Sequence, residues 1–190
     1  MLESLTEIDQ DLLIWINGLW IGKFQFFWLF VTRLENWSLL YLFFFYFLFT
    51  KFQKPVNYIA LLMVPLLVFV TLSLTNLVKN SVERLRPNNE PLLMNSIQVI
   101  QETESFSFWS GHSAVSFAMT TFIILALRSK AMTKWVFLFY FWPVIFALSR
   151  IFIGVHYPGD IFVGMSVGFL LGRGGFILLS KIEKRLQHPA

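Results

Sequence analysis

The side chains best suited to chemistry fall into three short groups along the chain. In order they are Lys79 with Arg86 and Pro87, then Ser110, Gly111 and His112, and finally Ser149, Arg150, His156 and Asp160. Together they supply three cations, two imidazoles, one carboxylate and a segment that could cradle an anion. Phosphoryl transfer needs such a set, because charge on the equatorial phosphate oxygens must be stabilised where little water is present. The pattern predicts a phosphate ester as the substrate.

The first group combines two cations with a proline. Lys79 and Arg86 are separated by six residues, so both would share one helix face if a helix continued across residues 80–85. Pro87 disfavours helix at the residue before it, which places Arg86 at a helix exit where its guanidinium can turn toward a ligand. Taken alone, two cations that merely flank a membrane span are the commoner explanation.

The second group stands at the start of an apolar segment. Ser110, Gly111 and His112 are expected in or near a first helical turn, where unpaired backbone N–H groups and a partial positive charge bind phosphate. Gly111 permits close approach of a ligand. Ser110 is also a good N-cap and His112 could be a structural histidine, so this group alone leaves capping and function equally open.

The third group places an imidazole four residues before a carboxylate. Pro158 and Gly159 suit a turn into a helix, so we expect His156 just outside the first turn and Asp160 just inside it. The carboxylate could then orient the imidazole and raise its nucleophilicity, and an interfacial His–Asp hydrogen bond is the alternative. No metal site is expected, because the surrounding cations would repel a divalent ion.

The composition is typical of a membrane protein. Of 190 residues, 56% are hydrophobic and 14% are charged, which leaves too little polar surface for a soluble domain of this size. There is no cysteine, so disulfides, thiolate metal sites and a thiol nucleophile are excluded. The net charge of +4 comes from cations at the ends of apolar segments, which argues against a nucleic-acid partner. The first residues are acidic where a signal peptide would be basic, so none is expected.

Five apolar stretches are expected to span the bilayer as helices. They are residues 36–50, 55–78, 105–127, 135–149 and 161–172, the last continuing past Arg173 to residue 180. Several are shorter than the roughly 20 residues that a perpendicular helix needs, so flanking residues must complete them. The short apolar stretch 24–32 is expected to be a shallow or re-entrant helix, with a sixth span as the alternative.

The N-terminal segment 2–20 has the pattern of an amphipathic helix that lies on the membrane. Its apolar residues Leu5, Ile8, Leu12, Leu13 and Ile16 recur at helical spacing, with acidic residues between them. The expected fold is therefore all-α and integral to the membrane, a bundle of five to six helices with one interfacial helix. A single domain over residues 1–190 is expected, with residues 1–35 interfacial or re-entrant and 36–180 forming the transmembrane core.

Charge predicts the orientation of the bundle. With five spans, one side holds eight cations and a single acid, Glu183; the cations are Lys51, Lys54, Arg128, Lys130, Lys134, Lys181, Lys184 and Arg185. By the positive-inside tendency that side is cytoplasmic. The two longer loops, residues 80–104 and 150–159, are then expected outside together with the N-terminal segment, in a bacterial inner membrane on the periplasmic side.

The order and spacing of the three groups resemble the signature of the type 2 phosphatidic acid phosphatases, which also occurs in bacterial lipid phosphatases and vanadium haloperoxidases. Its first part, Lys, six residues and Arg-Pro, and its third, Ser-Arg, five residues, His, three residues and Asp, are both matched in full. The second is usually Pro-Ser-Gly-His, and Trp109 stands in place of the proline. Loss of the proline loosens this loop unless Trp109 anchors it at the interface.

The resemblance implies a role for each matched residue. His156 would be a nucleophile that forms a phosphohistidine, Asp160 would orient it, and His112 would protonate the leaving oxygen. The residues implied to bind the phosphate are Lys79, Arg86 and Arg150, with the Ser110 side chain and the Gly111 backbone N–H. No metal or other cofactor is implied.

A site at the membrane boundary favours a substrate whose tail stays in the lipid. The candidates are undecaprenyl diphosphate, phosphatidylglycerol phosphate, phosphatidic acid and the phosphates of lipid A. We expect an isoprenoid or glycerolipid phosphate first, because the chain is a minimal core, with a lipid A phosphatase or a lipid phosphotransferase as alternatives. A non-catalytic protein that binds anionic lipid would need the cations but not His156 or Asp160. The sequence leaves the oligomeric state open.

Overall fold

The structure, a computed structural model, describes residues 2–93 and 95–187, and its regular elements in this part are all helices. The α-helices are α1 (Leu2–Asn17), α2 (Gln25–Val31), α3 (Ser38–Lys51), α4 (Val56–Val82), α5 (Gly111–Ser129), α6 (Phe141–Phe152) and α7 (Pro158–Gln187). Short 3-10 helices are η1 (Trp20–Lys23), η2 (Leu34–Trp37), η3 (Pro87–Asn89) and η4 (Lys134–Tyr140). The all-α prediction is confirmed. The ends of the expected single domain, residue 1 and residues 188–190, lie outside the described residues.

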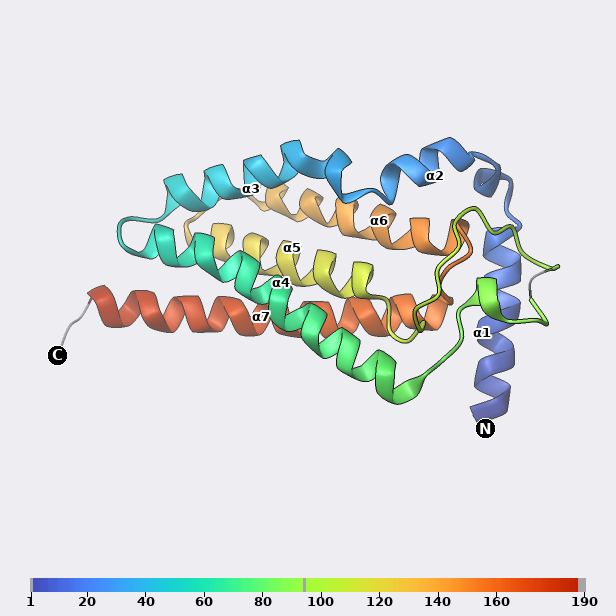
Figure 1. The fold of residues 1–190 in the computed structure, drawn as a ribbon. Helices are drawn as coiled ribbons and strands as arrows, with labels where there is room; N and C mark the ends of the chain where they lie inside the picture. Colours follow the sequence, from blue (N-terminus) through green and yellow to red (C-terminus); the bar gives the residue numbers. More distant parts are fainter. Residues whose placement is uncertain (1, 94, 188–190) are drawn as a thin grey trace.

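The helices from α3 to α7 run side by side as a bundle, and α1 crosses one end of it (Figure 1). α5 is at the centre, because it touches α3, α4, α6 and α7 and is buried along almost its whole length. Four segments of the described chain are long and apolar enough to cross a membrane: those of α4, α5, α6 with η4, and α7. α3, the remaining predicted span, has 14 residues and is reached directly from η2. Four of the five expected spans therefore have the required length.

The backbones of α5 and α7 approach closely enough to require glycine. A Cβ at Gly168 would lie 2.3 Å from the Ala114 carbonyl oxygen, and one at Gly164 would lie 2.6 Å from the Ser110 carbonyl oxygen. Small residues permit such packing between membrane helices, where van der Waals contact drives association. The Ser110 N–H also donates to the Asp160 carbonyl at 3.1 Å. The first turns of α5 and α7, which carry predicted site residues, are thus fixed against each other.

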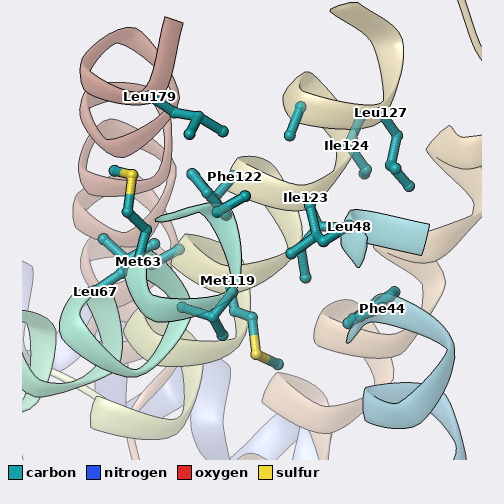
Figure 2. Close-up of a cluster of buried hydrophobic side chains, with 14 of the residues drawn as sticks. Phe44, Leu48, Met63, Leu67, Met119, Phe122, Ile123, Ile124, Leu127 and Leu179 are labelled. Atoms are coloured by element: carbon teal, nitrogen blue, oxygen red, sulfur yellow. The ribbon is translucent and has the colours of Figure 1, made fainter. Parts of the chain in front are cut away.

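The largest apolar core lies in the half of the bundle away from α1. Figure 2 shows its centre, where side chains from four helices meet: Phe44 and Leu48 of α3, Met63 and Leu67 of α4, Met119, Phe122, Ile123, Ile124 and Leu127 of α5, and Leu179 of α7. Phe122 and Ile123 are fully buried. This core holds the helices together and leaves the end near α1 for polar groups.

α5 begins later than predicted. The third span was expected from residue 105, whereas α5 starts at Gly111. The Ser110 hydroxyl accepts a hydrogen bond from the Ser113 N–H and so caps the helix there. The apolar residues before this cap belong to a loop.

α4 also ends before it could carry both cations of the first group. Its last residue is Val82, and Glu83 adopts a left-handed conformation with φ of 51°. The condition under which Lys79 and Arg86 would share one helix face, a helix that continues across residues 80–85, is therefore not met. Arg86 lies in extended backbone, as Pro87 requires of its predecessor.

α1 presents apolar side chains on two faces. Leu13 is fully buried and Ile16 partly so, and both pack against the bundle. Leu5, Ile8 and Trp15 are 57–64% exposed. An exposed apolar stripe of this kind is what an interfacial helix inserts into the headgroup region.

The predicted charge asymmetry coincides with the two ends of the bundle. The α3–α4 turn, the α5–η4 turn and the C-terminal end of α7 lie together at the end opposite α1 (Figure 1). These segments carry the eight cations assigned to the cytoplasmic side. Both longer loops lie at the α1 end.

Candidate active site

The predicted site residues meet at the end of the bundle that α1 crosses. Residues 83–110 lead from α4 to α5, and residues 153–157 join α6 to α7. Gly154 has φ of +79°, a left-handed conformation that favours glycine. The chain turns there, and the Val155 N–H donates to the Arg150 carbonyl at 3.1 Å. His156 consequently lies just before α7 and Asp160 in its first turn, as predicted.

His156 and Asp160 form a buried pair. Nδ1 of His156 lies 3.2 Å from Oδ2 of Asp160, and the two side chains are 1% and 0% exposed. The same Oδ2 accepts hydrogen bonds from the Tyr157 N–H at 3.1 Å and from the Ser107 hydroxyl. Oδ1 accepts one from Arg84 at 2.9 Å. These partners fix the orientation of the carboxylate relative to the imidazole.

The second imidazole nitrogen of His156 faces a cation. Nη1 of Arg86 lies 3.1 Å from Nε2 of His156. A guanidinium can only donate, so Nε2 is the acceptor and the ring proton is on Nδ1, toward Asp160. Burial, and after it the positive charge of Arg86, lower the pKa of His156 well below its usual range. The ring is neutral, with a lone pair on Nε2.

Lys79, Arg86 and Arg150 come from three different segments and line one cavity. Lys79 Nζ donates to the Phe106 carbonyl at 2.7 Å, and Arg86 Nε donates to the Ser105 carbonyl at 2.6 Å. Among the ion pairs of the described chain, none joins one of these three cations to a carboxylate. Buried positive charge without a counter-ion is costly, so this arrangement favours an anionic ligand.

Arg150 has an incomplete set of hydrogen bonds. Its Nη1 donates to the Thr32 hydroxyl at 2.6 Å, while its Nε has no partner in the described chain. The residue is 4% exposed, and an unsatisfied buried donor costs free energy. Because Thr32 follows α2 directly, the predicted shallow helix supports this cation from outside the bundle.

The residues of the second group have two different roles: Ser110 caps α5, whereas Gly111 and His112 line the cavity. The Ser110 hydroxyl is fully buried, accepts from the Ser113 N–H at 3.4 Å and the Ser113 hydroxyl at 3.1 Å, and is not part of the cavity wall that the structure describes. Gly111 and His112 do line the cavity. The His112 ring stacks on Phe146 with centroids 5.3 Å apart. Ser110 is thus the N-cap, and the first turn of α5 opens on the cavity.

Trp109, the one departure from the resembled signature, is anchored inside the bundle. It is 9% exposed, and its Nε1 donates to the buried Thr75 hydroxyl at 2.9 Å. Thr75 belongs to α4 and lines the cavity. The indole therefore fastens the segment before α5 to the bundle itself, and not to the membrane interface.

One cavity of about 1220 Å³ connects the polar groups with the apolar interior. Its polar end is lined by Lys79, Arg86, His112, Arg150 and His156. Small-molecule sites usually occupy about 300–1,000 Å³, so this cavity has room for a phosphate and more. Asp160 lies behind His156 and outside the described wall, which suits a residue that acts on the imidazole.

The rest of the cavity is an apolar groove between α3 and α4. Its wall includes Phe45 of α3 and Leu61, Val64, Pro65, Val68, Phe69 and Leu72 of α4. At 1.5 Å per residue, α4 rises about 27 Å between Leu61 and Lys79. This length is close to the roughly 30 Å of the bilayer hydrocarbon core. The groove could hold an apolar tail while its phosphate lies among the cations.

Four residues that hold the site were missed from the sequence: Asp9, Thr32, Arg84 and Ser107. Asp9 is one of the acidic residues between the apolar residues of the N-terminal segment, and Arg84 lies within residues 80–85, for which a continued helix was only considered. Ser107 stands in an aromatic run without a distinguishing pattern. The one available signal was Arg84, a third cation close to Arg86.

Two relatives of this chain are named as lipid A 4'-phosphatases. The chain is 27% identical over 191 residues to a lipid A 4'-phosphatase from Bacteroides thetaiotaomicron, covering 98% of this chain and 84% of the relative. It is 26% identical over 182 residues to a lipid A 4'-phosphatase from Porphyromonas gingivalis, covering 90% and 72%.

A solved structure and a family model extend the comparison. The fold matches the crystal structure of a transmembrane PAP2-type phosphatidylglycerolphosphate phosphatase from Bacillus subtilis, with a TM-score of 0.65, 21% identity and coverage of 100% of this chain and 89% of that one. The family model described as the PAP2 superfamily matches residues 58–184. That range contains all three groups of predicted site residues.

Proposed function

This chain belongs to the PAP2 superfamily and is an integral-membrane lipid phosphatase, and we propose that His156 is the nucleophile with which it attacks phosphorus. The observation that carries the proposal is the geometry of the buried His156 ring, whose Nε2 lies 3.1 Å from Arg86 Nη1 and whose Nδ1 lies 3.2 Å from Asp160 Oδ2. A phosphate bound by Arg86 would bring its phosphorus to Nε2.

In the first step, Nε2 forms a bond to phosphorus while the bond between phosphorus and the lipid oxygen breaks. His112 gives its proton to the leaving oxygen, so the lipid departs as an alcohol. His156 becomes cationic as the new bond forms, and the Asp160 carboxylate stabilises that charge through Nδ1–H.

In the second step, water attacks the phosphohistidine. His112, now neutral, takes a proton from the water, the N–P bond breaks and inorganic phosphate leaves. Lys79, Arg86 and Arg150 stabilise the charge on the phosphate oxygens in both steps. The Gly111 N–H adds a donor at the start of α5, and Ser110 contributes by capping that helix. The reaction as written needs no metal ion and no organic cofactor.

The groove between α3 and α4 supports a substrate with a long apolar tail. Because two relatives that align with 90% or more of this chain are named lipid A 4'-phosphatase, we place a lipid A phosphate first among the substrates. A glycerophospholipid phosphate comes second and an isoprenoid phosphate third, although the sequence alone favoured these two classes equally over lipid A. Transfer to a second lipid would use the same residues.

The charge asymmetry supports an orientation with the site outside. Eight cations lie at the end of the bundle opposite the cavity's polar end, which by the positive-inside tendency is cytoplasmic. The phosphate would then be removed at the outer leaflet of a bacterial inner membrane.

The decisive experiment compares wild type with His156→Ala in vesicles. Phosphate release would be measured with lipid A, phosphatidylglycerol phosphate, phosphatidic acid and undecaprenyl diphosphate. We expect release from the preferred lipid to fall by at least about 10³-fold, because no other group replaces the nucleophile. Binding of the lipid should be kept, since the three cations remain. Unchanged release from His156→Ala would overturn the mechanism.

The same assay tests the metal-free site. A chelator should leave phosphate release unchanged, and vanadate should inhibit it because vanadate mimics the transferring phosphoryl group. Release that disappears with chelator and returns with a divalent ion would contradict this mechanism. Lipid binding without any phosphate release would instead favour the non-catalytic alternative.

A further inference from the structure

Arg84 bridges two carboxylates at the edge of the site. Its Nη1 donates to Asp160 Oδ1 at 2.9 Å, and its Nη2 donates to Asp9 Oδ2 at 2.8 Å. Its guanidinium carbon lies 3.7 Å from the centroid of the Tyr157 ring. The face of the guanidinium is held by the ring and its edge by two anions, so its position is determined on three sides.

Asp9 connects this bridge to α7. Its Oδ1 accepts a hydrogen bond from the Gly159 N–H at 2.7 Å, in the first turn of α7, where the helix dipole favours an anion. The contact is tight, since a Cβ at Gly159 would lie 2.8 Å from Asp9 Oδ2. Asp11, two residues further along α1, is exposed. One acid of the N-terminal helix is therefore turned inward to the start of α7.

The bridge acts on the oxygen of Asp160 that does not face His156. Oδ2 serves the imidazole, and Oδ1 is held by Arg84. Without Arg84, a fully buried carboxylate oxygen would lose its charged donor and the carboxylate could rotate. Without Asp9, the whole charge of Arg84 would act on Asp160 and weaken its support for Nδ1–H of the imidazole.

We propose that Asp9 and Arg84 are positioning residues, which hold the Asp160 carboxylate in the orientation that the nucleophile His156 needs. The inference rests on the proposed roles of His156 and Asp160. It makes α1 part of the catalytic apparatus and more than a membrane anchor. Neither Asp9 nor Arg84 lines the described cavity, so both act through Asp160 and not on the substrate.

The test is a double-mutant cycle on the lipid of the panel that is hydrolysed fastest. Arg84→Gln and Asp9→Asn should each lower kcat about 10- to 100-fold and leave KM within about twofold, as expected when a partner that orients a reacting group is lost. Asp11→Asn is the matched control on the same helix and should have no effect. In an Asp160→Asn background, either substitution should cost less than about twofold more, because the group that it positions is already impaired.

Each outcome decides one claim. If the losses multiply in the Asp160→Asn background, or if KM rises instead of kcat falling, Asp9 and Arg84 do not act through Asp160 and the positioning role is wrong. If Asp160→Asn alone leaves kcat unchanged, the proposed role of the His–Asp pair fails instead. If Arg84→Gln does not fold, the cycle of Asp9→Asn with Asp160→Asn gives the same answer. Asp9→Asn should fold, because the asparagine oxygen can still accept a hydrogen bond from the Gly159 N–H.

Discussion

The two ends of the helix bundle are both rich in cations, but the cations differ in their burial and in their ion pairs. At the end opposite the polar end of the cavity, Lys130 pairs with Glu183 and lies over the Phe52 ring, and most of the neighbouring cations are exposed. At the cavity end, Arg86 and Arg150 are each 4% exposed, and no carboxylate of the described chain pairs with them. The number of cations therefore predicts topology, whereas burial without a counter-ion predicts an anion site.

The difference between the two ends is tested most directly by neutralising one arginine at each end. Arg150→Gln should lower kcat/KM about 10²- to 10³-fold, because a preorganised donor to the charge that develops on phosphate is lost. Arg128→Gln, at the opposite end, should leave kcat/KM within about twofold. Phosphate release from vesicles measures both variants.

Folding must be monitored in both variants by thermal unfolding in detergent. Equal losses of activity in Arg150→Gln and Arg128→Gln, with both proteins folded, would mean that the buried cation has no special role in catalysis.

The difference between the ends also explains what the sequence could reveal. The spans follow from hydropathy, and the grouping of the eight cations follows from their positions between the spans. Each segment carries these signals by itself, so the bundle and this grouping were predictable. The pair of His156 and Asp160 was predictable too, because a spacing of four across a helix start brings the side chains together. Such signals are local.

Contacts between distant segments were not predictable in the same way. Asp9 reaches Gly159 across 150 positions of the chain, and Thr32 reaches Arg150 across 118. An acid on an amphipathic helix is normally solvated, so nothing in the pattern of α1 distinguished Asp9 from Asp11. The sequence left the end of α4 open for a related reason, because the left-handed turn occurs at Glu83, where no glycine marks it.

A second comparison, between the polar end of the cavity and its apolar groove, leads to a smaller expected effect. Val68→Trp should fill part of the groove and raise KM about tenfold for a long-tailed lipid phosphate, because the tail loses burial. The same phosphate on a short, water-soluble chain should be hydrolysed as before. Val70→Trp is the matched control, since Val70 is exposed on the same helix and is not part of the described cavity wall. Equal losses for both chain lengths would place the tail elsewhere.

The smallest expected effect is the dependence of folding stability on pH. It arises at the polar end of the cavity, because both histidines that the structure describes lie there. Burial, then Arg86, lower the pKa of His156 below the value of about 6.5 that it has in the unfolded chain. The folded state then binds fewer protons than the unfolded state, so stability is complete above about pH 6.5 and is lost as pH falls below it, by up to about 1.4 kcal/mol per pH unit. Thermal unfolding between pH 5 and 8 should show this loss in wild type and a shallower one in His156→Gln. Parallel curves would mean that His156 is not held neutral, and with that the lone pair proposed for attack on phosphorus would be absent.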